Sequence, residues 1–202
     1  MATKGSPANR PPAEAAAAAP VRRLRRAERR EQLLAAATRA FARAGFAATS
    51  LDDIAAAAGI SRVLLYRHFE SKTDLYRAVL DRAVGRLAAA VGTRDYTDAS
   101  IDALLGAAAE DPDGFRLLFH HAAREPEFRQ EMDRFRRGMV ATAHRQLARV
   151  IGDRAWAQWA AQLAPVVAVE AVMAWLDAGQ PDPDRAADRI RQALAGVISA
   201  AR

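Results

Sequence analysis

Apolar residues recur along most of this 202-residue chain at intervals of three and four positions, the spacing that places them on one face of an α-helix. No stretch of strand length alternates β-branched and polar residues. The pattern therefore predicts an all-α protein. Two short helices are expected on either side of Gly59, and longer helices at residues 25–44, 72–91, 101–109, 115–124, 126–151, 154–178 and 183–201.

Both short helices fall in residues 49–72, TSLDDIAAAAGISRVLLYRHFESK. Gly59 is suited to end the first, because glycine adopts a left-handed backbone without a Cβ penalty, and Ser61 is suited to cap the second. Two helices joined by so short a turn indicate a helix-turn-helix, whose second helix can enter the DNA major groove. An ordinary helical hairpin in a core is the alternative. It does not account for the residues on the outer face of the second helix, which are Arg62, Val63, Tyr66, Arg67 and His68.

This stretch resembles the DNA-binding signature of the TetR family of transcriptional regulators. The matching positions are Thr49, Asp53, Ile54, Ala55, Ala58, Gly59, Ile60, Ser61, Leu65, Tyr66, His68, Phe69, Ser71, Lys72 and Leu75. Val63 and Leu64 depart from the small or hydroxylic residues that are often found at these two positions in the family. The resemblance covers about residues 26–80, and beyond them only the helical layout agrees.

The resemblance implies an N-terminal three-helix helix-turn-helix DNA-binding domain followed by a C-terminal helical ligand-binding and dimerisation domain. It assigns Tyr66, His68 and Lys72 to phosphates, and Arg62 with Val63 to base edges. The chemistry agrees, because arginine can donate two hydrogen bonds to guanine and an apolar side chain can meet a thymine methyl group. The expected DNA-binding residues are Arg25, Arg26, Thr49, Ser61, Arg62, Val63, Tyr66, Arg67, His68 and Lys72.

Two of the signature positions, Leu65 and Phe69, are expected in the core rather than on DNA. Thr49 is expected to donate a hydrogen bond to a phosphate from an exposed helix N-terminus, where the helix dipole also favours an anion. An arginine cluster precedes the signature and is expected to contact phosphates, although such charge runs are usually solvated helix faces. Its members are Arg22, Arg23, Arg25, Arg26, Arg29 and Arg30.

The distribution of charge indicates that the two halves of the chain have different functions. Residues 1–95 carry 17 Lys and Arg against 9 Asp and Glu, whereas residues 96–202 carry 13 against 15, so polyanion binding is expected in the first half. Residues 1–21, rich in Ala and Pro, are expected to form a disordered arm. Residues 22–71 are expected to form the helix-turn-helix domain, and residues 72–202 a linker helix plus the ligand-binding and dimerisation domain.

The composition narrows the class of protein. The chain has no cysteine, which excludes disulfides, thiolate zinc sites and cysteine nucleophiles. No apolar run reaches the ~18 residues needed to span a bilayer. The N-terminus lacks the apolar stretch of a signal peptide, so a protein of the bacterial cytoplasm, associated with the nucleoid when bound to DNA, is expected.

The most apolar segment is residues 154–178, which need cover on more than one face. The resemblance implies dimerisation through the last two helices, with Leu163, Val167, Ile190, Leu194 and Val197 at the interface. Glu170 is the one charged residue between positions 165 and 176, and it must be paired, protonated or turned toward a cavity. A salt bridge and a polar anchor of an apolar effector pocket both remain open. The pocket would be lined by Phe115, Phe119, Phe135, Met139, Trp159 and Trp175.

No catalytic motif is present, since G-x-S-x-G, H-E-x-x-H and a glycine-rich phosphate loop are all missing from the sequence, and neither an enzyme nor a cofactor is expected. His121 and Glu125 have i,i+4 spacing, but a glutamate beside a helix-initiating proline is more often a cap or a surface charge, so no metal site is predicted. The expected function is that of a homodimeric repressor that leaves an inverted-repeat DNA operator when a small hydrophobic effector binds. A helical protein-binding adaptor that keeps the motif without specific DNA binding is the alternative.

Overall fold

The computed structural model describes residues 26–92 and 94–202, and these residues contain no β-strand, which confirms the all-α prediction. The arm predicted at residues 1–21 lies outside the described residues, as do Arg22, Arg23 and Arg25. The elements are α1 (Arg26–Ala48), α2 (Leu51–Ala57), α3 (Arg62–Tyr66), α4 (Lys72–Val91), α5 (Ala99–Glu110), α6 (Pro112–Arg116), η1 (Leu117–His121), η2 (Ala122–Arg124), η3 (Pro126–Phe128), α7 (Arg129–Leu147), α8 (Arg154–Asp177) and α9 (Pro183–Ala200).

Local hydrogen bonds within the signature motif set the starts of α2, α3 and α4. The hydroxyl oxygen of Ser50 accepts the backbone N–H of Asp53 at 3.1 Å, and the Asp53 carboxylate accepts the N–H of Ser50 at 3.3 Å, which together form a capping box. Ser61 and Ser71 cap α3 and α4 through their hydroxyl oxygens. Gly59, with a φ of 65°, makes the turn between α2 and α3.

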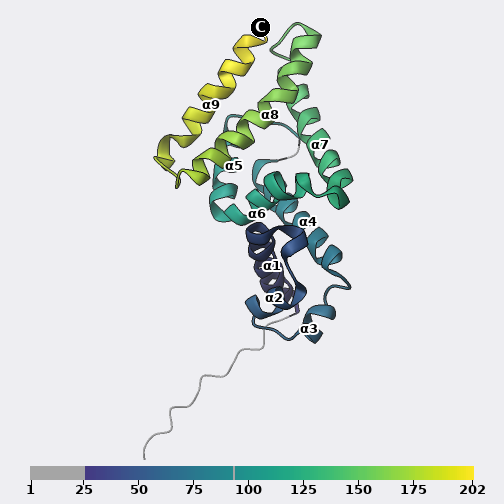
Figure 1. Ribbon diagram of the computed structural model, residues 1–202. Helices are drawn as coiled ribbons and strands as arrows, with labels where there is room; N and C mark the ends of the chain where they lie inside the picture. The colour runs from purple at the N-terminus through teal and green to yellow at the C-terminus, as the bar shows by residue number, and fades with distance from the viewer. Residues whose placement is uncertain (1–25, 93) are drawn as a thin grey trace, which may run out of the picture.

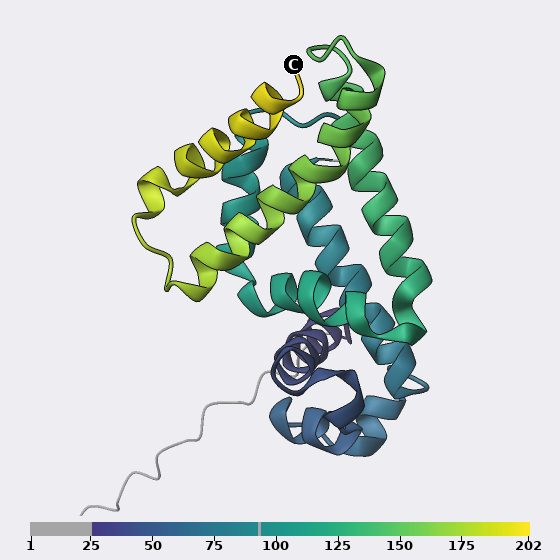
Figure 2. The ribbon, with the colours of Figure 1, turned by 45° about the horizontal axis from the view of Figure 1, so that its top comes forward.

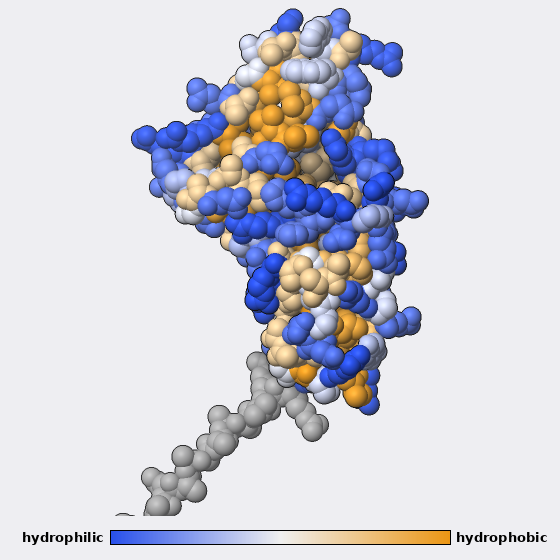
Figure 3. Space-filling model, viewed as in Figure 1, coloured by the Kyte–Doolittle hydropathy of each residue, from blue (hydrophilic) through white to orange (hydrophobic). Residues whose placement is uncertain are grey.

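The helices form two stacked groups joined by α4 (Figure 1). The first group, α1 to α3, lies at one end of the molecule, and α5, α7, α8 and α9 lie at the other. α4 packs against α1 in the first group and against α5 in the second, and α6 lies over α1 where the groups meet (Figure 2). On the face seen in Figure 3, hydrophilic residues cover most of the surface, and apolar residues gather between α8 and α9.

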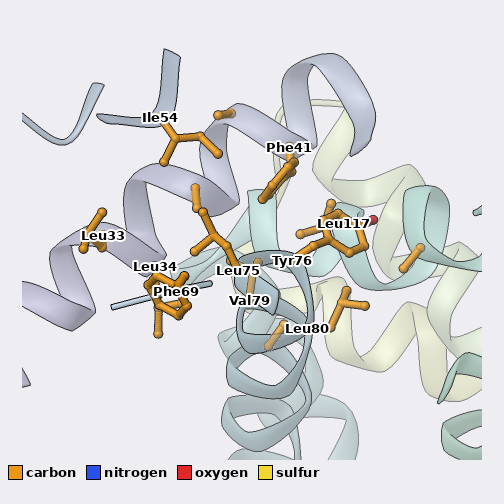
Figure 4. Close-up of a cluster of buried hydrophobic side chains, with 14 of the residues drawn as sticks. Leu33, Leu34, Phe41, Ile54, Phe69, Leu75, Tyr76, Val79, Leu80 and Leu117 are labelled. Atoms are coloured by element: carbon orange, nitrogen blue, oxygen red, sulfur yellow. The ribbon is translucent and has the colours of Figure 1, made fainter. Parts of the chain in front are cut away.

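The hydrophobic core of the helix-turn-helix extends into the second group (Figure 4). The Tyr76 ring on α4 lies 4.8 Å from the Phe41 ring of α1 and 4.4 Å from the Phe128 ring of η3, measured between centroids. Leu65 and Phe69 are buried in this core, as predicted. Fully burying one such side chain contributes roughly 1.5–3 kcal/mol, so the shared core resists separation of the two groups. Residues 117–132 add Leu117, Leu118, Ala122, Phe128 and Met132 to it.

Residues 115–124 are helical, as predicted, but they do not form one regular α-helix. α6 ends at Arg116, η1 is a π-helix and η2 is a 3₁₀-helix. On a regular α-helix Phe115, Leu118 and Ala122 would share one face. Here Phe115 packs in a second core, between α5, α8 and α9, whereas Leu118 and Ala122 pack in the first. The wider π turn supplies the rotation that lets one segment serve both cores.

α8 requires a correction to the expectation that no segment has the length and composition to span a bilayer. Within the described residues it is the one helix that is long and apolar enough to cross a membrane, a criterion that the core helix of a soluble protein also meets. It runs without interruption through Pro165 and packs against α5, α7 and α9. Less than half of its most apolar 18-residue stretch is buried within the chain.

Candidate nucleic-acid interface

α3 has one buried face and one exposed face. Leu65 is fully buried in the first core, whereas Val63 is 68% exposed and Tyr66 is 43% exposed. Arg62 and Arg67 are exposed as well. α3 lies at the free end of the first group of helices, so nothing in the described part of the chain covers its outer face (Figure 1). A partner as large as a DNA duplex can therefore reach it.

The guanidinium of Arg62 is held by two neighbouring side chains. Its Nη1 donates to the Asp52 carboxylate at 3.0 Å, and its Nη2 donates to the hydroxyl oxygen of Tyr66 at 3.4 Å. The guanidinium carbon lies 5.6 Å from the centroid of the Tyr66 ring. The hydrogen bond to Tyr66 and then the charge of Asp52 raise the pKa of Arg62. Because a guanidinium carries five N–H donors, donors remain for the acceptor atoms of a base.

α1 and α3 also enclose an open depression with a basic lining and a volume of about 490 Å³. Burial lowers the pKa of His68, and the nearby positive charges of Arg26, Arg30 and Arg29 lower it further. Clustered guanidinium groups around an open space suit an anion such as a DNA phosphate. The lining of this basic depression consists of Arg26, Arg29, Leu64, Arg67 and His68.

The structure places Lys72 differently from the expectation of a phosphate contact. Its ammonium group donates to the carbonyl oxygens of Phe46 at 2.9 Å, Thr49 at 3.2 Å and Ala47 at 3.3 Å, and lies 4.5 Å from the centroid of the Phe46 ring. An ammonium group has three N–H donors, so all three are engaged within the protein. Lys72 instead ties the first residue of α4 to the end of α1.

Thr49 also differs from the expectation. It is 4% exposed, and its hydroxyl group donates to the carbonyl oxygen of Gly45 at 2.7 Å, with the Ala40 carbonyl oxygen at 3.3 Å. The non-helical backbone of Gly45 opens the last turn of α1 and leaves carbonyl groups that need donors. The hydroxyl group of Thr49 donates its one proton to these carbonyl groups, at the shortest distance to Gly45, and is not presented to a phosphate.

The remaining predicted DNA-binding residues differ in position. Ser61 stays at the surface, where its hydroxyl oxygen accepts the N–H of Leu64 at 3.3 Å and caps α3. Arg25 lies outside the described residues. Asp52 and Leu64 were not among the residues predicted for the site. The signal for Asp52 was available, because an acidic first turn in α2 precedes an arginine in the first turn of α3.

Four of the predicted effector-pocket residues, Phe115, Phe119, Met139 and Trp175, belong to or pack against the second core, and Phe135 packs against the first. The Phe115, Phe119 and Phe135 rings form a chain with centroid distances of 4.7 and 5.8 Å, and Phe119 packs against both the first and the second core. Met139 and Trp175 pack at the edge of the second core, and the Trp175 indole N–H donates to the carbonyl oxygen of Pro181 at 2.9 Å.

The other two predicted pocket residues, Trp159 and Glu170, lie exposed on the outer side of α8. The seven residues therefore do not line a single cavity. Because water solvates the exposed carboxylate of Glu170, that group needs neither a cavity nor a buried partner. Within the described part of the chain, no group of three His, Cys, Asp or Glu residues is arranged to hold a metal ion.

Some of the residues predicted for a dimer interface are buried within their own chain and cannot contact a partner. Ile190 is 5% exposed and belongs to the second core, so its assignment to the interface is corrected. Leu194 packs partly against the second core, and Val197 packs against a third core formed where the ends of α7, α8 and α9 meet. Leu163 and Val167 are half-buried on α8. The apolar stripe of α9 is thus used largely within its own chain.

Other apolar or small residues of α8 and α9 remain exposed. Trp156 and Trp159 are 50% and 40% exposed and form an edge-to-face pair with ring centroids 5.6 Å apart, and Val166 is exposed further along α8. On α9 the exposed residues include Ala193 and Gly196, which are small. We refer to this surface as the α8–α9 apolar face.

The exposed face of α3, the capped turn before it and the basic depression beside it define a helix-turn-helix DNA-binding protein. The family described as "Bacterial regulatory proteins, tetR family" matches residues 33–79. The HTH-type transcriptional repressor SCO4008 of Streptomyces coelicolor is 31% identical over 128 residues, which are 60% of this chain and 67% of that protein.

Two further comparisons agree. The HTH-type transcriptional activator FasR of Mycolicibacterium smegmatis is 42% identical over 107 residues, so the match spans 49% of each chain, about half the length of that relative. The crystal structure of a TetR-like transcriptional regulator from Rhodococcus sp. RHA1 superposes with a TM-score of 0.72 at 26% identity, covering 89% of this chain and 100% of that one. The chain belongs to the TetR family of DNA-binding transcriptional regulators.

Proposed function

We propose that this regulator is a homodimeric repressor that binds an inverted-repeat operator through α3 and leaves it when a small apolar effector binds. The observation that carries the proposal is the exposed face of α3 beside the basic depression. Arg62 and Val63 would contact base edges, while Tyr66, Arg67 and His68 would contact phosphates. SCO4008 is named as a repressor, which supports repression, whereas FasR is named as an activator.

The proposal of a homodimer rests on the α8–α9 apolar face. Trp156, Trp159 and Val166 leave apolar surface open to water, and a second copy of the same face would cover it about a two-fold axis. Small residues on α9 would let a partner helix approach closely. Two copies of α3 could then enter successive major grooves, which lie about 34–36 Å apart along the duplex.

The proposed effector site includes fewer residues than the one expected from the sequence. Phe115, Phe119, Phe135 and Met139 line the region where the first and second cores meet, and Trp159 and Glu170 are left out of it. Aromatic rings and a thioether suit an apolar ligand. A ligand that separates these rings would change how residues 117–132 pack against α1 and α4, and with them the position of α3.

A footprint of the pure protein on the DNA upstream of its own gene tests this function. Protection of two half-sites with two chains bound is expected, and Arg62→Ala should lower operator affinity by about 1–3 kcal/mol with little effect on random DNA. Arg137→Ala, which removes an exposed arginine on α7, is the matched control. Equal affinity of the parent protein for operator and random DNA would instead favour a protein-binding adaptor.

The effector is tested by a thermal-shift screen of apolar compounds. A true effector should raise the melting temperature and lower operator affinity, because the two bindings are linked by one coupling free energy. Phe119→Ala should abolish both responses to the same compound. A compound that stabilises the protein and leaves operator affinity unchanged would contradict the effector role.

A further inference from the structure

The recognition helix carries an ion pair that the DNA-binding role described so far does not use. Asp52 lies in the first turn of α2 and Arg62 is the first residue of α3, and the carboxylate oxygen lies 3.0 Å from Nη1 of the guanidinium. Both side chains are more than half exposed. On its other side, the same guanidinium contacts the hydroxyl group and ring of Tyr66.

Stability does not explain this pair. Exposed ion pairs contribute roughly 0–1 kcal/mol to folding. The helix cap does not explain it either, because the capping box of α2 uses the carboxylate of Asp53 and not that of Asp52. A carboxylate beside the base-reading residue also repels DNA phosphates and weakens binding to every sequence. Asp52 lies in the first turn of α2, where the helix dipole favours a negative charge. Its contact with Arg62 offers a further advantage.

The advantage that the geometry offers is orientation. A free arginine side chain loses considerable rotamer freedom when its guanidinium donates two parallel hydrogen bonds to guanine. Asp52 on one side and Tyr66 on the other hold the Arg62 guanidinium before DNA arrives, while leaving N–H donors free. We propose that Asp52 is a positioning residue for Arg62, orienting its guanidinium toward one base in each half-site and so increasing sequence discrimination. This inference rests on the proposed function, in which Arg62 contacts a base edge.

The test measures how well the Asp52→Asn variant discriminates the operator from an operator with one changed base. Affinities are compared for the operator, for an operator changed at the base whose recognition Arg62→Ala abolishes, and for random DNA. Discrimination at that base should fall roughly twofold to tenfold, the scale of ordering one flexible side chain. Affinity for random DNA should stay the same or rise, because a repelling charge is removed. Glu70→Gln is the matched control, since it removes an exposed acid near α3 that has no contact with Arg62 in the described structure, and it should leave discrimination unchanged.

A double-mutant cycle separates this inference from the function on which it rests. In the Arg62→Ala background, Asp52→Asn should have no further effect on discrimination. If no operator base loses discrimination in Arg62→Ala, the proposed base contact itself is wrong. If Arg62→Ala abolishes discrimination at one base and Asp52→Asn preserves it, the positioning role alone is overturned. Equal gains of affinity on all three DNAs would show that Asp52 acts only as a repelling charge, which also overturns it.

Discussion

At the scale of single residues, substituting Lys72 tests whether its side chain stabilises the fold or contacts a DNA phosphate. Lys72→Met should lower the free energy of unfolding by about 1.5–3 kcal/mol, because the carbonyl groups at the end of α1 lose hydrogen bonds to a charged donor. The slope of log K against log salt for operator binding should not change, since Lys72 neutralises no phosphate. Urea unfolding and salt titrations measure the two quantities.

Arg67 provides the matched comparison for Lys72. It is exposed in the basic depression, so Arg67→Met should leave unfolding unchanged and reduce the salt slope by about 0.9 for each phosphate that is no longer neutralised. A salt slope that fell equally in the Lys72 and Arg67 variants would return Lys72 to the phosphate-contacting set.

His68 predicts that operator binding depends on pH. In the free protein, burial and the neighbouring arginines hold the pKa of His68 below its usual value. A phosphate in the basic depression would favour the charged imidazolium, so the pKa is higher in the complex and binding takes up a proton. Operator affinity should therefore rise as the pH falls from about 8 to about 6, the range in which histidine titrates.

Fluorescence anisotropy across this pH range measures the effect. His68→Asn should flatten the pH profile, whereas His144→Asn, on α7, should leave it unchanged. A profile that rises equally steeply without His68 would place the titrating group elsewhere.

The residues of the site show what the sequence could predict. The motif predicted the residues of α3, and their outward orientation follows from the burial of Leu65 in the same short helix. It did not predict the partners of Lys72, because those carbonyl groups lie 23 to 26 positions earlier in the chain and come near only when α4 packs against α1. Thr49 is buried where its hydroxyl group donates to the carbonyl oxygen of Gly45 in α1.

At the scale of elements, helix limits could be predicted wherever a side chain caps the backbone. α4 begins at Lys72 after Ser71 and ends at Val91, as expected, and α8 begins after its cap, Asp153. The segment after residue 115 could not be predicted in this way. Its π and 3₁₀ turns arise because two separate cores compete for apolar side chains that a regular helix would place on one face.

An ion-pair cluster joins three of these elements and predicts a measurable coupling. Arg82 on α4 is 12% exposed and donates to Glu31 of α1 at 3.0 Å and to Asp111 at 3.2 Å. Asp111 also caps α6, by accepting the N–H of Gly114 at 3.0 Å. Arg82→Met should lower the free energy of unfolding by about 1–3 kcal/mol, because it removes the hydrogen bonds that a largely buried charged donor makes to two carboxylates.

Arg86 is the control for the Arg82 prediction. It contacts the same Asp111 carboxylate at 3.4 Å from a more exposed position, so Arg86→Met should cost less than about 1 kcal/mol. Equal losses of stability in urea unfolding would mean that the buried position of Arg82 is not what gives the cluster its strength.

At the scale of the whole molecule, the apolar pattern of one chain does not tell which surface faces a partner. Ile190 belongs to the same helical stripe as Leu194 and Val197, yet the second core buries it within its own chain. α8 is apolar on most sides, so its sequence pattern does not predict which side faces the core and which faces a partner. Only packing shows that Trp156, Trp159 and Val166 remain uncovered. The free surface is therefore a property of the fold.

The uncovered surface gives the prediction for the assembly. Trp159→Glu combined with Val166→Glu would place two charges in the proposed dimer interface, where burying them unpaired costs several kcal/mol, while in one chain both sites are solvated. Sedimentation should show monomers with unchanged helix content by circular dichroism. Operator affinity should fall together with dimerisation, because a monomer can engage only one half-site. Ala141→Glu adds a charge to the exposed side of α7 and should leave a dimer that binds the operator normally. A double variant that remained dimeric would move the interface away from the α8–α9 apolar face.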